Sequence, residues 1–332
     1  MTKLLVPRSL TIAVYLFKRF LSMKKYWLLL LMQAAIIGGV FAQNDPTPFA
    51  VRADSLARKA GRLAPAIIEW KKDYAITRQS ETAGSIARSY ALSGEIDSAF
   101  NWLDIALAHD STPNVLLDDQ LFPLVPLPRW ADLEARQIAK ITAQPSNIRN
   151  VQLARQLWRL GMKDQAFSYE GNLSNRLLGL ESPVSKAVWL LQQKNREENL
   201  QEIKQIIRAT GWPRKSDVGE DAAQVAFYVV QHSDVAAQEA FIPLLKSACE
   251  TGEGNCRDYA TMYDRILINN GKNQFYGTQY QYKTVNGARV LDLFPIESPE
   301  FVDKRRRSMG LTWPFSKQMA LIGIIFEVPQ KD

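Results

Sequence analysis

The side chains best suited to proton transfer or ligand binding gather in the last third of this 332-residue chain. His232 ends an apolar helical stretch one turn after Tyr228, and the C-terminal end of a helix favours a protonated imidazole. His232 could therefore serve as a proton donor or contact an anion. It could equally donate to the last carbonyls of its own helix, a role that needs no ligand.

Asp264 is the carboxylate that could act with this histidine. It falls on the partly apolar side of a predicted helix over 257–270, where a carboxylate needs a partner. Arg305 or Arg306 could be that partner, either in a structural ion pair or within an acid–base site. His232 and Asp264 are therefore the candidate catalytic residues, and general acid–base chemistry is the catalysis that they could perform.

A strip of neutral donors and acceptors surrounds Gly277, a residue that allows close approach of the backbone. Such a strip suits a sugar, a nucleobase or a peptide amide, and it could equally satisfy the β-hairpin that follows. The candidate ligand-binding residues are Trp212, Gln231, Arg265, Gln274, Tyr276, Thr278, Gln279, Arg305 and Arg306.

Several other chemistries are excluded by composition and spacing. No metalloprotease or zinc-finger spacing occurs among the two histidines and two cysteines, and any other zinc site would need several carboxylates. A phosphate-binding glycine loop, a dinucleotide fingerprint and a nucleophile elbow are also missing, so no cofactor is expected. Cys249 and Cys256 could close a small disulfide loop across the turn at Gly252–Gly254 or remain two reduced thiols.

The elements that must position these residues are mainly helical. Residues 82–110 alternate small and large apolar side chains at helical spacing on either side of Gly94, which predicts a helical hairpin. The spacing resembles one tetratricopeptide repeat, with a weaker match in the preceding pair over 48–77. The residues that carry the resemblance are Ala87, Tyr90, Gly94, Ala99, Leu103 and Ala106.

A second domain is predicted over 146–332, after a boundary at Pro145 and Asn147. It should be an α domain with one β-hairpin at about 274–294, in which Asn286 and Gly287 form a two-residue turn. Asp217 and Glu220 predict a capping box. The predicted helices cover 148–160, 183–195, 198–210, 217–232, 235–250 and 257–270.

The N-terminus reads as an export signal. Basic residues after Met23 precede an apolar run, and small residues favour cleavage before Gln43. Residues 23–42 would then be a signal peptide, residues 1–22 an upstream extension or a mis-assigned start, and residues 43–145 the helical hairpins. We therefore expect an exported, periplasmic or secreted protein without a retained membrane span.

The charge of the chain lies mostly in this leader. Six of the seven excess positive charges fall in residues 1–42, so the remainder carries a formal charge of +1. A nearly neutral surface exerts no long-range attraction on polyanions, which argues against a nucleic-acid partner.

An ordered set of residues in the second domain resembles an uncharacterised bacterial domain family of unknown function. The resemblance spans about 150–312, and it implies a domain and a site without naming a substrate. Asp164 and Gln165 fit the start of the family pattern, whereas Ser168 stands where the family places an arginine. The set comprises Gly211, Trp212, Pro213, Val218, Gly219, Gln231, His232, Asp234, Asp264, Arg265, Gln274, Tyr276, Gly277, Thr278, Gln279, Arg305, Arg306 and Gly310.

Two functions follow as hypotheses. The first is a scaffold whose helical hairpins over 43–145 bind a peptide or protein, together with a second, ligand-binding domain. The alternative is a small-molecule enzyme in which His232 is the general acid or base, Asp264 orients it, and Arg305 or Arg306 holds an anion.

Overall fold

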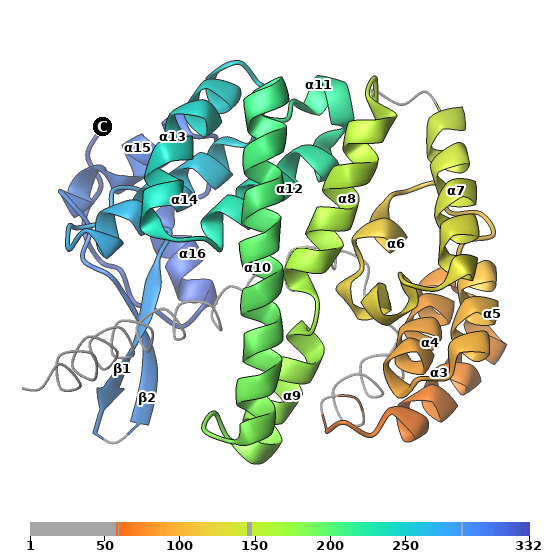
Figure 1. The fold of residues 1–332 in the computed structure, drawn as a ribbon. Helices are drawn as coiled ribbons and strands as arrows, with labels where there is room; N and C mark the ends of the chain where they lie inside the picture. Colours follow the sequence, from red (N-terminus) through yellow and green to blue (C-terminus); the bar gives the residue numbers. More distant parts are fainter. Residues whose placement is uncertain (1–57, 59, 145–147, 287) are drawn as a thin grey trace, which may run out of the picture. The chain divides into compact units, whose positions relative to one another are not determined.

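The computed structural model describes residues 58, 60–144, 148–286 and 288–332 (Figure 1). The predicted signal peptide and upstream extension lie outside the described residues. Two structural units are present, a helical unit that ends at Met262 and a C-terminal unit over Tyr263–Asp332. The architecture is mainly α with a single antiparallel hairpin near the C-terminus of the described chain, which confirms the predicted fold class.

The helical unit contains the hairpin predicted over 82–110, preceded by one described helix. Its elements are α3 (Leu63–Thr77), α4 (Ser80–Ser93), α5 (Ile96–Ala106), α6 (Asn114–Leu117), the 3-10 helix η2 (Asp119–Leu124), α7 (Pro128–Ala143), α8 (Val151–Gln165), α9 (Ser168–Leu178), α10 (Pro183–Thr210), α11 (Lys215–Val218), α12 (Glu220–Gln231), α13 (Val235–Glu250) and α14 (Cys256–Asn269), which continues into the C-terminal unit. Gly94 turns the chain between α4 and α5 with a φ of 79°, a conformation that glycine adopts without steric cost.

Helix α7 ties this hairpin to α8. On one side Gln137 donates from Nε2 to the carbonyl oxygens of Asp110 and Thr112, at 3.1 and 2.9 Å. On the other side the Glu134 carboxylate, which is 2% exposed, accepts from Arg155 and Arg159 at 2.6 Å each. Burial acts to raise the pKa of Glu134, but these two guanidinium groups lower it below its usual range.

Helices α8, α10 and α12 run side by side in Figure 1 and carry much of the site described below. Asn195 and Asn199 on α10 each donate from Nδ2 to a main-chain carbonyl of α8, at 3.2 Å. Gly161 on α8 leaves room for Val225 of α12, because a Cβ at this position would lie 2.8 Å from Val225 Cγ2. These contacts fix α8 against both neighbours.

Two predictions for this region were wrong. Residues 183–210 form one helix and not two, because neither glycine nor proline interrupts the chain between the two predicted segments. The capping box at Asp217 is also absent: Gly219, with a φ of 83°, separates α11 from α12 and leaves α12 without a side-chain cap. Asp217 instead accepts, through its main-chain carbonyl, from the N–H groups of Arg149 and Asn150.

The C-terminal unit contains the predicted hairpin. Strands β1 (Tyr280–Val285) and β2 (Ala288–Leu293) pair antiparallel with Tyr280 opposite Leu293, as the alternation predicted. Gly287 of the predicted turn lies outside the described residues. The 3-10 helix η3 (Pro299–Phe301) and helices α15 (Val302–Ser308) and α16 (Phe315–Leu321) complete the unit.

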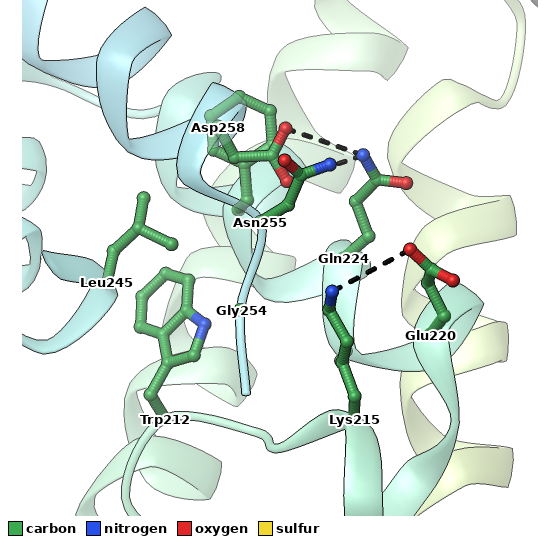
Figure 2. A pocket seen from close by; sticks show the side chains of 10 residues that line it. Trp212, Lys215, Glu220, Gln224, Leu245, Gly254, Asn255 and Asp258 are labelled. Carbon is green, nitrogen blue, oxygen red and sulfur yellow. Dashed lines mark hydrogen bonds and ion pairs between the residues drawn. The ribbon is translucent and has the colours of Figure 1, made fainter. Parts of the chain in front are cut away.

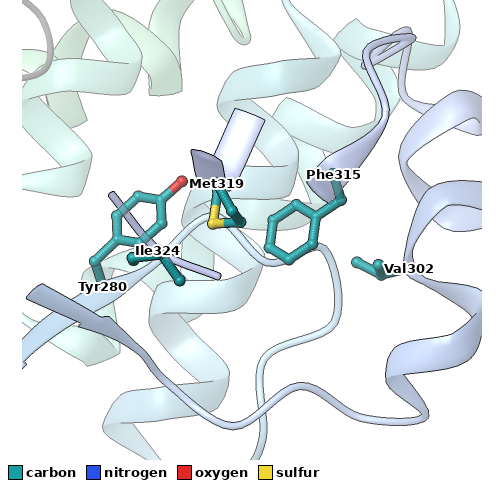
Figure 3. Packing of buried hydrophobic residues seen from close by; sticks show 5 residues of the cluster. All are labelled: Tyr280, Val302, Phe315, Met319 and Ile324. Carbon is teal, nitrogen blue, oxygen red and sulfur yellow. The ribbon is translucent and has the colours of Figure 1, made fainter. Parts of the chain in front are cut away.

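One hydrophobic cluster forms the core of this unit (Figure 3). Tyr280 of β1 is 9% exposed, and Val302, Phe315 and Met319 of the last two helices are fully buried, with Ile324 beside them. Burial of each large side chain contributes about 1.5 to 3 kcal/mol to stability. The cluster thereby holds the hairpin against α15 and α16.

Gly277 provides a direct test of this packing. A Cβ there would lie 2.7 Å from Phe315 Cζ, and its φ of 73° is already unfavourable for other residues. We expect Gly277→Ala to lower the free energy of unfolding by about 2 to 4 kcal/mol, as overpacking adds to backbone strain. The measurement is urea unfolding followed by tryptophan fluorescence.

Gly271→Ala is the matched control for this substitution. Gly271 has nearly the same φ, 72°, but a Cβ added there would meet no heavy atom within 4 Å. This variant should therefore lose only the strain component, about 1 to 2 kcal/mol. Equal losses in the two variants would contradict the close contact with Phe315.

Candidate functional site

The ends of α8 and α12 bring His232 against a buried carboxylate. His232 is the C-cap of α12, and its Nδ1 lies 2.6 Å from Oδ2 of Asp164 in the last turn of α8. The two side chains are 6% and 1% exposed. Gln165 donates from Nε2 to the same carboxylate oxygen at 2.6 Å. Asp164 is thus the carboxylate that orients His232, through Nδ1 of the imidazole. The predicted partner was Asp264.

The charge state of Asp164 fixes the tautomer of this histidine. Burial acts to raise the pKa of Asp164, but the charge and hydrogen bond of His232, the charge of Arg196 and the hydrogen bond of Gln165 together hold it below its usual range. An ionised carboxylate can only accept hydrogen bonds, so the proton must lie on Nδ1 of His232. In the neutral imidazole this leaves the lone pair on Nε2, the arrangement required of a general base.

Arg196 on α10 is the other cation whose charge acts on Asp164. It is partly buried, and burial lowers its pKa while Asp164 acts in the opposite direction. The side-chain amide of Gln193 satisfies both of its polar atoms when its oxygen faces Arg196 and Trp189. In this orientation the oxygen accepts from Arg196 Nη1 at 2.9 Å and from Trp189 Nε1 at 3.2 Å. The guanidinium is therefore held in place on α10.

Asp264 is used to build a loop. Its Oδ1 accepts from the N–H groups of Phe275 and Tyr276 at 2.7 and 2.9 Å, and its Oδ2 accepts from the N–H and hydroxyl of Thr278 at 2.9 and 2.8 Å. The side chain is completely buried. Burial nevertheless raises the pKa of Asp264, against the lowering effect of these four hydrogen bonds.

The remaining polar candidates of the C-terminal unit hold the same loop. Gln274 closes it by accepting from the N–H of Gln279 at 2.8 Å and donating to its carbonyl at 3.0 Å. Arg305 donates to the carbonyl oxygens of Phe275, Glu297 and Ser298, and Arg306 donates to those of Tyr276 and of the Gln318 side chain. Asp264, Gln274, Tyr276, Thr278, Gln279, Arg305 and Arg306 thus form one hydrogen-bonded assembly.

The other candidates lie in buried positions. Gln231 is 4% exposed, and its carbonyl accepts from Nε2 of Gln238 at 3.0 Å. Arg265 is 6% exposed on α14. Cys249 and Cys256 are joined by a disulfide, which closes the loop between α13 and α14. In the described part of the chain, no three histidine, cysteine, aspartate or glutamate side chains are grouped closely enough to bind a metal ion.

Trp212 contributes to a small cavity under this disulfide loop (Figure 2). The cavity measures about 10 Å³. The loop is fastened beside it, because Glu253 accepts through its carbonyl from the N–H of Lys215 at 3.1 Å and through Oε2 from the N–H of Ser216 at 3.0 Å. The lining residues are Trp212, Lys215, Glu220, Ala223, Gln224, Phe227, Leu245, Gly254, Asn255 and Asp258.

Asp258 is the ionisable group buried in the wall of this cavity. It is 5% exposed, and its hydrogen bonds from Gln224 Nε2 are long, at 3.3 and 3.4 Å. Burial raises the pKa of Asp258 to about 7. Burial and the charge of Asp258 also raise the pKa of Tyr228 to about 12. This carboxyl group therefore changes charge near neutral pH.

A second partly buried carboxyl behaves in the same way. Burial and the charges of Asp118 and Glu170 raise the pKa of Asp119 in η2 to about 7.

Three functional candidates could not be found from the sequence: Asp119, Asp258 and Arg196. An acid near a helix start, or an arginine within a polar helix, has no distinctive spacing. Asp164 did carry a signal, its place in the family pattern, but the sequence did not pair it with His232.

Comparison with models of protein families gives a match, which lies in the second domain. Residues 179–327 match the model of DUF6624, a family of unknown function. The uncharacterised domain predicted from the ordered residues is thereby confirmed, whereas the tetratricopeptide resemblance stays a prediction. No curated protein and no solved structure matches the chain.

The DUF6624 match includes His232 but not its partner. Asp164 precedes the matched residues by one helix, yet it makes the direct contact with His232. No helix in the described ranges is both long enough and apolar enough to cross a bilayer.

The raised pKa of Asp258 makes stability depend on pH. The folded protein binds this proton more tightly than the unfolded chain, whose aspartates titrate near the ordinary value of 3.8. The stabilisation is therefore complete below pH 3.8 and is lost as the pH rises through about 7. Asp258→Asn, which mimics the protonated acid, should exceed wild type in stability at pH 8 by about 2 to 4 kcal/mol and match it at pH 4.

Urea unfolding of both proteins between pH 4 and pH 8.5 measures this difference. Asp97→Asn is the control, because the Asp97 side chain is 95% exposed and should leave the pH profile unchanged. A difference between Asp258→Asn and wild type that stays constant with pH would show that the folded carboxyl titrates normally.

Proposed function

We propose that this chain is an acid–base enzyme for a small polar substrate, with His232 as the general base and Asp164 as its positioning residue. The observation that carries the proposal is the buried contact of 2.6 Å between Nδ1 of His232 and Oδ2 of Asp164. A carboxylate at Nδ1 sets the tautomer and stabilises the imidazolium that forms once Nε2 has taken a proton.

Three features support this role. The pair is nearly inaccessible to water, which strengthens its electrostatic interaction. Among the residues that the structure describes, none forms a hydrogen bond with Nε2 of His232, so the lone pair of this atom is not engaged by the described part of the chain. Arg196 adds a fixed positive charge near Asp164, although burial lowers its pKa.

The roles of the other residues change accordingly. Asp264 and Arg305 have their polar atoms engaged with the loop over 274–279, so they act as its structural supports. The reaction class that fits an oriented imidazole is activation of a water molecule or a hydroxyl group by removal of a proton. Export belongs to the same proposal, supported by the leader sequence and by the disulfide, a bond that persists in oxidising compartments.

The test is hydrolysis of a panel of nitrophenyl esters, phosphates and glycosides by the mature protein. We expect turnover of one class, with kcat/KM reduced about 10²- to 10⁴-fold in His232→Gln and about 10²-fold or more in Asp164→Asn. The second loss arises because an amide can donate to Nδ1 and thereby move the imidazole proton to Nε2. Imidazole ¹⁵N chemical shifts, in a protein with only two histidines, report the tautomer independently of activity.

His109→Gln is the matched control, because His109 is the other histidine and is exposed. It should keep full activity and the Nδ1–H signal of His232. Wild-type turnover that survives in His232→Gln would refute the proposed base. An unchanged tautomer in Asp164→Asn would refute the positioning role.

A second candidate function is protein binding by the N-terminal helical hairpins. Helix α3 packs against α4 through Ile67 and Trp70, yet it leaves Ile68 and Ile76 55% and 80% exposed. Exposed branched aliphatic residues on a helical hairpin suit a partner that covers them.

Loss of this surface tests the scaffold function. The mature protein should retain a partner from an envelope extract, and the double variant Ile68→Ser, Ile76→Ser should retain at least about tenfold less of it, since central apolar residues contribute most to an interface. Glu81→Gln on the exposed side of α4 is the control. Identical captured proteins in the wild type and the double variant would exclude this surface.

A further inference from the structure

We propose that the cavity lined by Trp212, Gln224 and Asp258 is a second ligand site, which binds the primary ammonium group of a small amine. The site is formed entirely by α11, α12, α13, the disulfide loop and the start of α14, with Trp212 just before α11 (Figure 2). It shares no residue with the His232–Asp164 pair. The inference is therefore independent of the proposed enzyme function.

The size of the cavity fits an ammonium head group. Its volume of about 10 Å³ is close to the minimum that holds one water molecule. An ammonium group has about the same size as water, whereas a carboxylate, a phosphate or a sugar ring would not enter. The dimensions thus favour a compact head whose remaining atoms lie outside.

The charge of the wall favours a cation over water. The carboxyl group of Asp258 is 5% exposed, and its side-chain donor is Gln224 at 3.3 and 3.4 Å, distances longer than the usual range of about 2.7–3.2 Å. A buried carboxylate is stable only when close donors or a cation replace its lost water. An ammonium group supplies both a positive charge and three donors.

The chain's own cations leave this position open. Lys215 lines the cavity, but its Nζ lies 3.8 Å from Oε1 of Glu220, which partly neutralises it. Arg257, the neighbour of Asp258 in α14, is exposed, and its charge acts on Asp258 only by lowering its pKa. No salt bridge to Asp258 is formed by any residue of the described ranges.

The rest of the lining suits the head group. Trp212 and Phe227 place aromatic rings at the cavity, and aromatic faces attract cations. Asn255 brings a side-chain amide oxygen, which accepts from the N–H of Arg257 at 3.0 Å and keeps a second lone pair for a donor of the ligand. Ligands without a positive charge gain nothing from this combination.

Binding should depend on pH through the ionisation of Asp258. The groups that act on its charge are Glu220, which raises the pKa, and Lys215 and Arg257, which lower it; Tyr228 on α12 stays protonated below about pH 12. With the pKa at about 7, the carboxylate form prevails at pH 8.5 and the neutral acid at pH 5.5. An ammonium ligand should therefore bind more tightly at the higher pH.

The experiment measures thermal stabilisation of the oxidised, full-length mature protein by methylammonium chloride at constant ionic strength. A ligand of the folded state raises the Tm with concentration, following mass action. We expect a saturable rise at pH 8.5 whose half-maximal concentration is at least about tenfold higher at pH 5.5, since the apparent affinity scales with the ionised fraction. Tetramethylammonium, which is too large for the cavity, should act like sodium chloride.

Asp258→Asn should abolish the methylammonium effect, while Asp221→Asn should keep it. Asp221 is the matched control, because it lies one turn before Gln224 on α12 and burial raises its pKa, but it does not line the cavity. A rise that persists in Asp258→Asn, or that tetramethylammonium reproduces, would overturn the site. Absence of any saturable rise at pH 8.5 would overturn it equally.

Discussion

The free-energy cost of burying a carboxylate is the constraint on which this structure depends. Three acids with side chains no more than 2% exposed are each held by two or more close donors. Glu134 binds two arginines, Asp164 binds His232 and Gln165, and Asp264 binds three main-chain N–H groups and a hydroxyl. Because an unpartnered buried charge costs several kcal/mol, each of these contacts specifies how two segments must lie.

In the helical unit this requirement places α8 at the centre of the arrangement. Its early turns supply the arginines that hold Glu134 of α7, its last turn supplies the carboxylate that holds His232 of α12, and its carbonyls accept from the asparagines of α10. One helix thus connects the N-terminal hairpins to the matched domain. The same contacts that stabilise the unit also orient the imidazole, so stability and the proposed chemistry rest on the same residues.

In the C-terminal unit the polar residues that first suggest a ligand site stabilise a loop. A loop without regular pairing must satisfy its main-chain groups by other means, and here side chains take that role. Asp264 accepts from the N–H groups, whereas Arg305 and Arg306 donate to the carbonyl oxygens. By contrast, Asp258 in the helical unit has only long hydrogen bonds from Gln224, and burial raises its pKa to about 7. The long hydrogen bonds of this buried acid are the feature that marks its cavity as a candidate ligand site.

The sequence by itself determined the local structure: most of the helices, the register of Tyr280 opposite Leu293, and the presence of an uncharacterised domain. These follow from periodicity, turn residues and an ordered pattern, all of which act over short separations. The prediction of two helices over 183–210 was wrong, although the absence of glycine and proline between the two segments was itself readable from the sequence. Only the tertiary structure decided that His232 meets Asp164, 68 positions away, since a buried charge selects its partner by three-dimensional proximity and not by spacing along the chain.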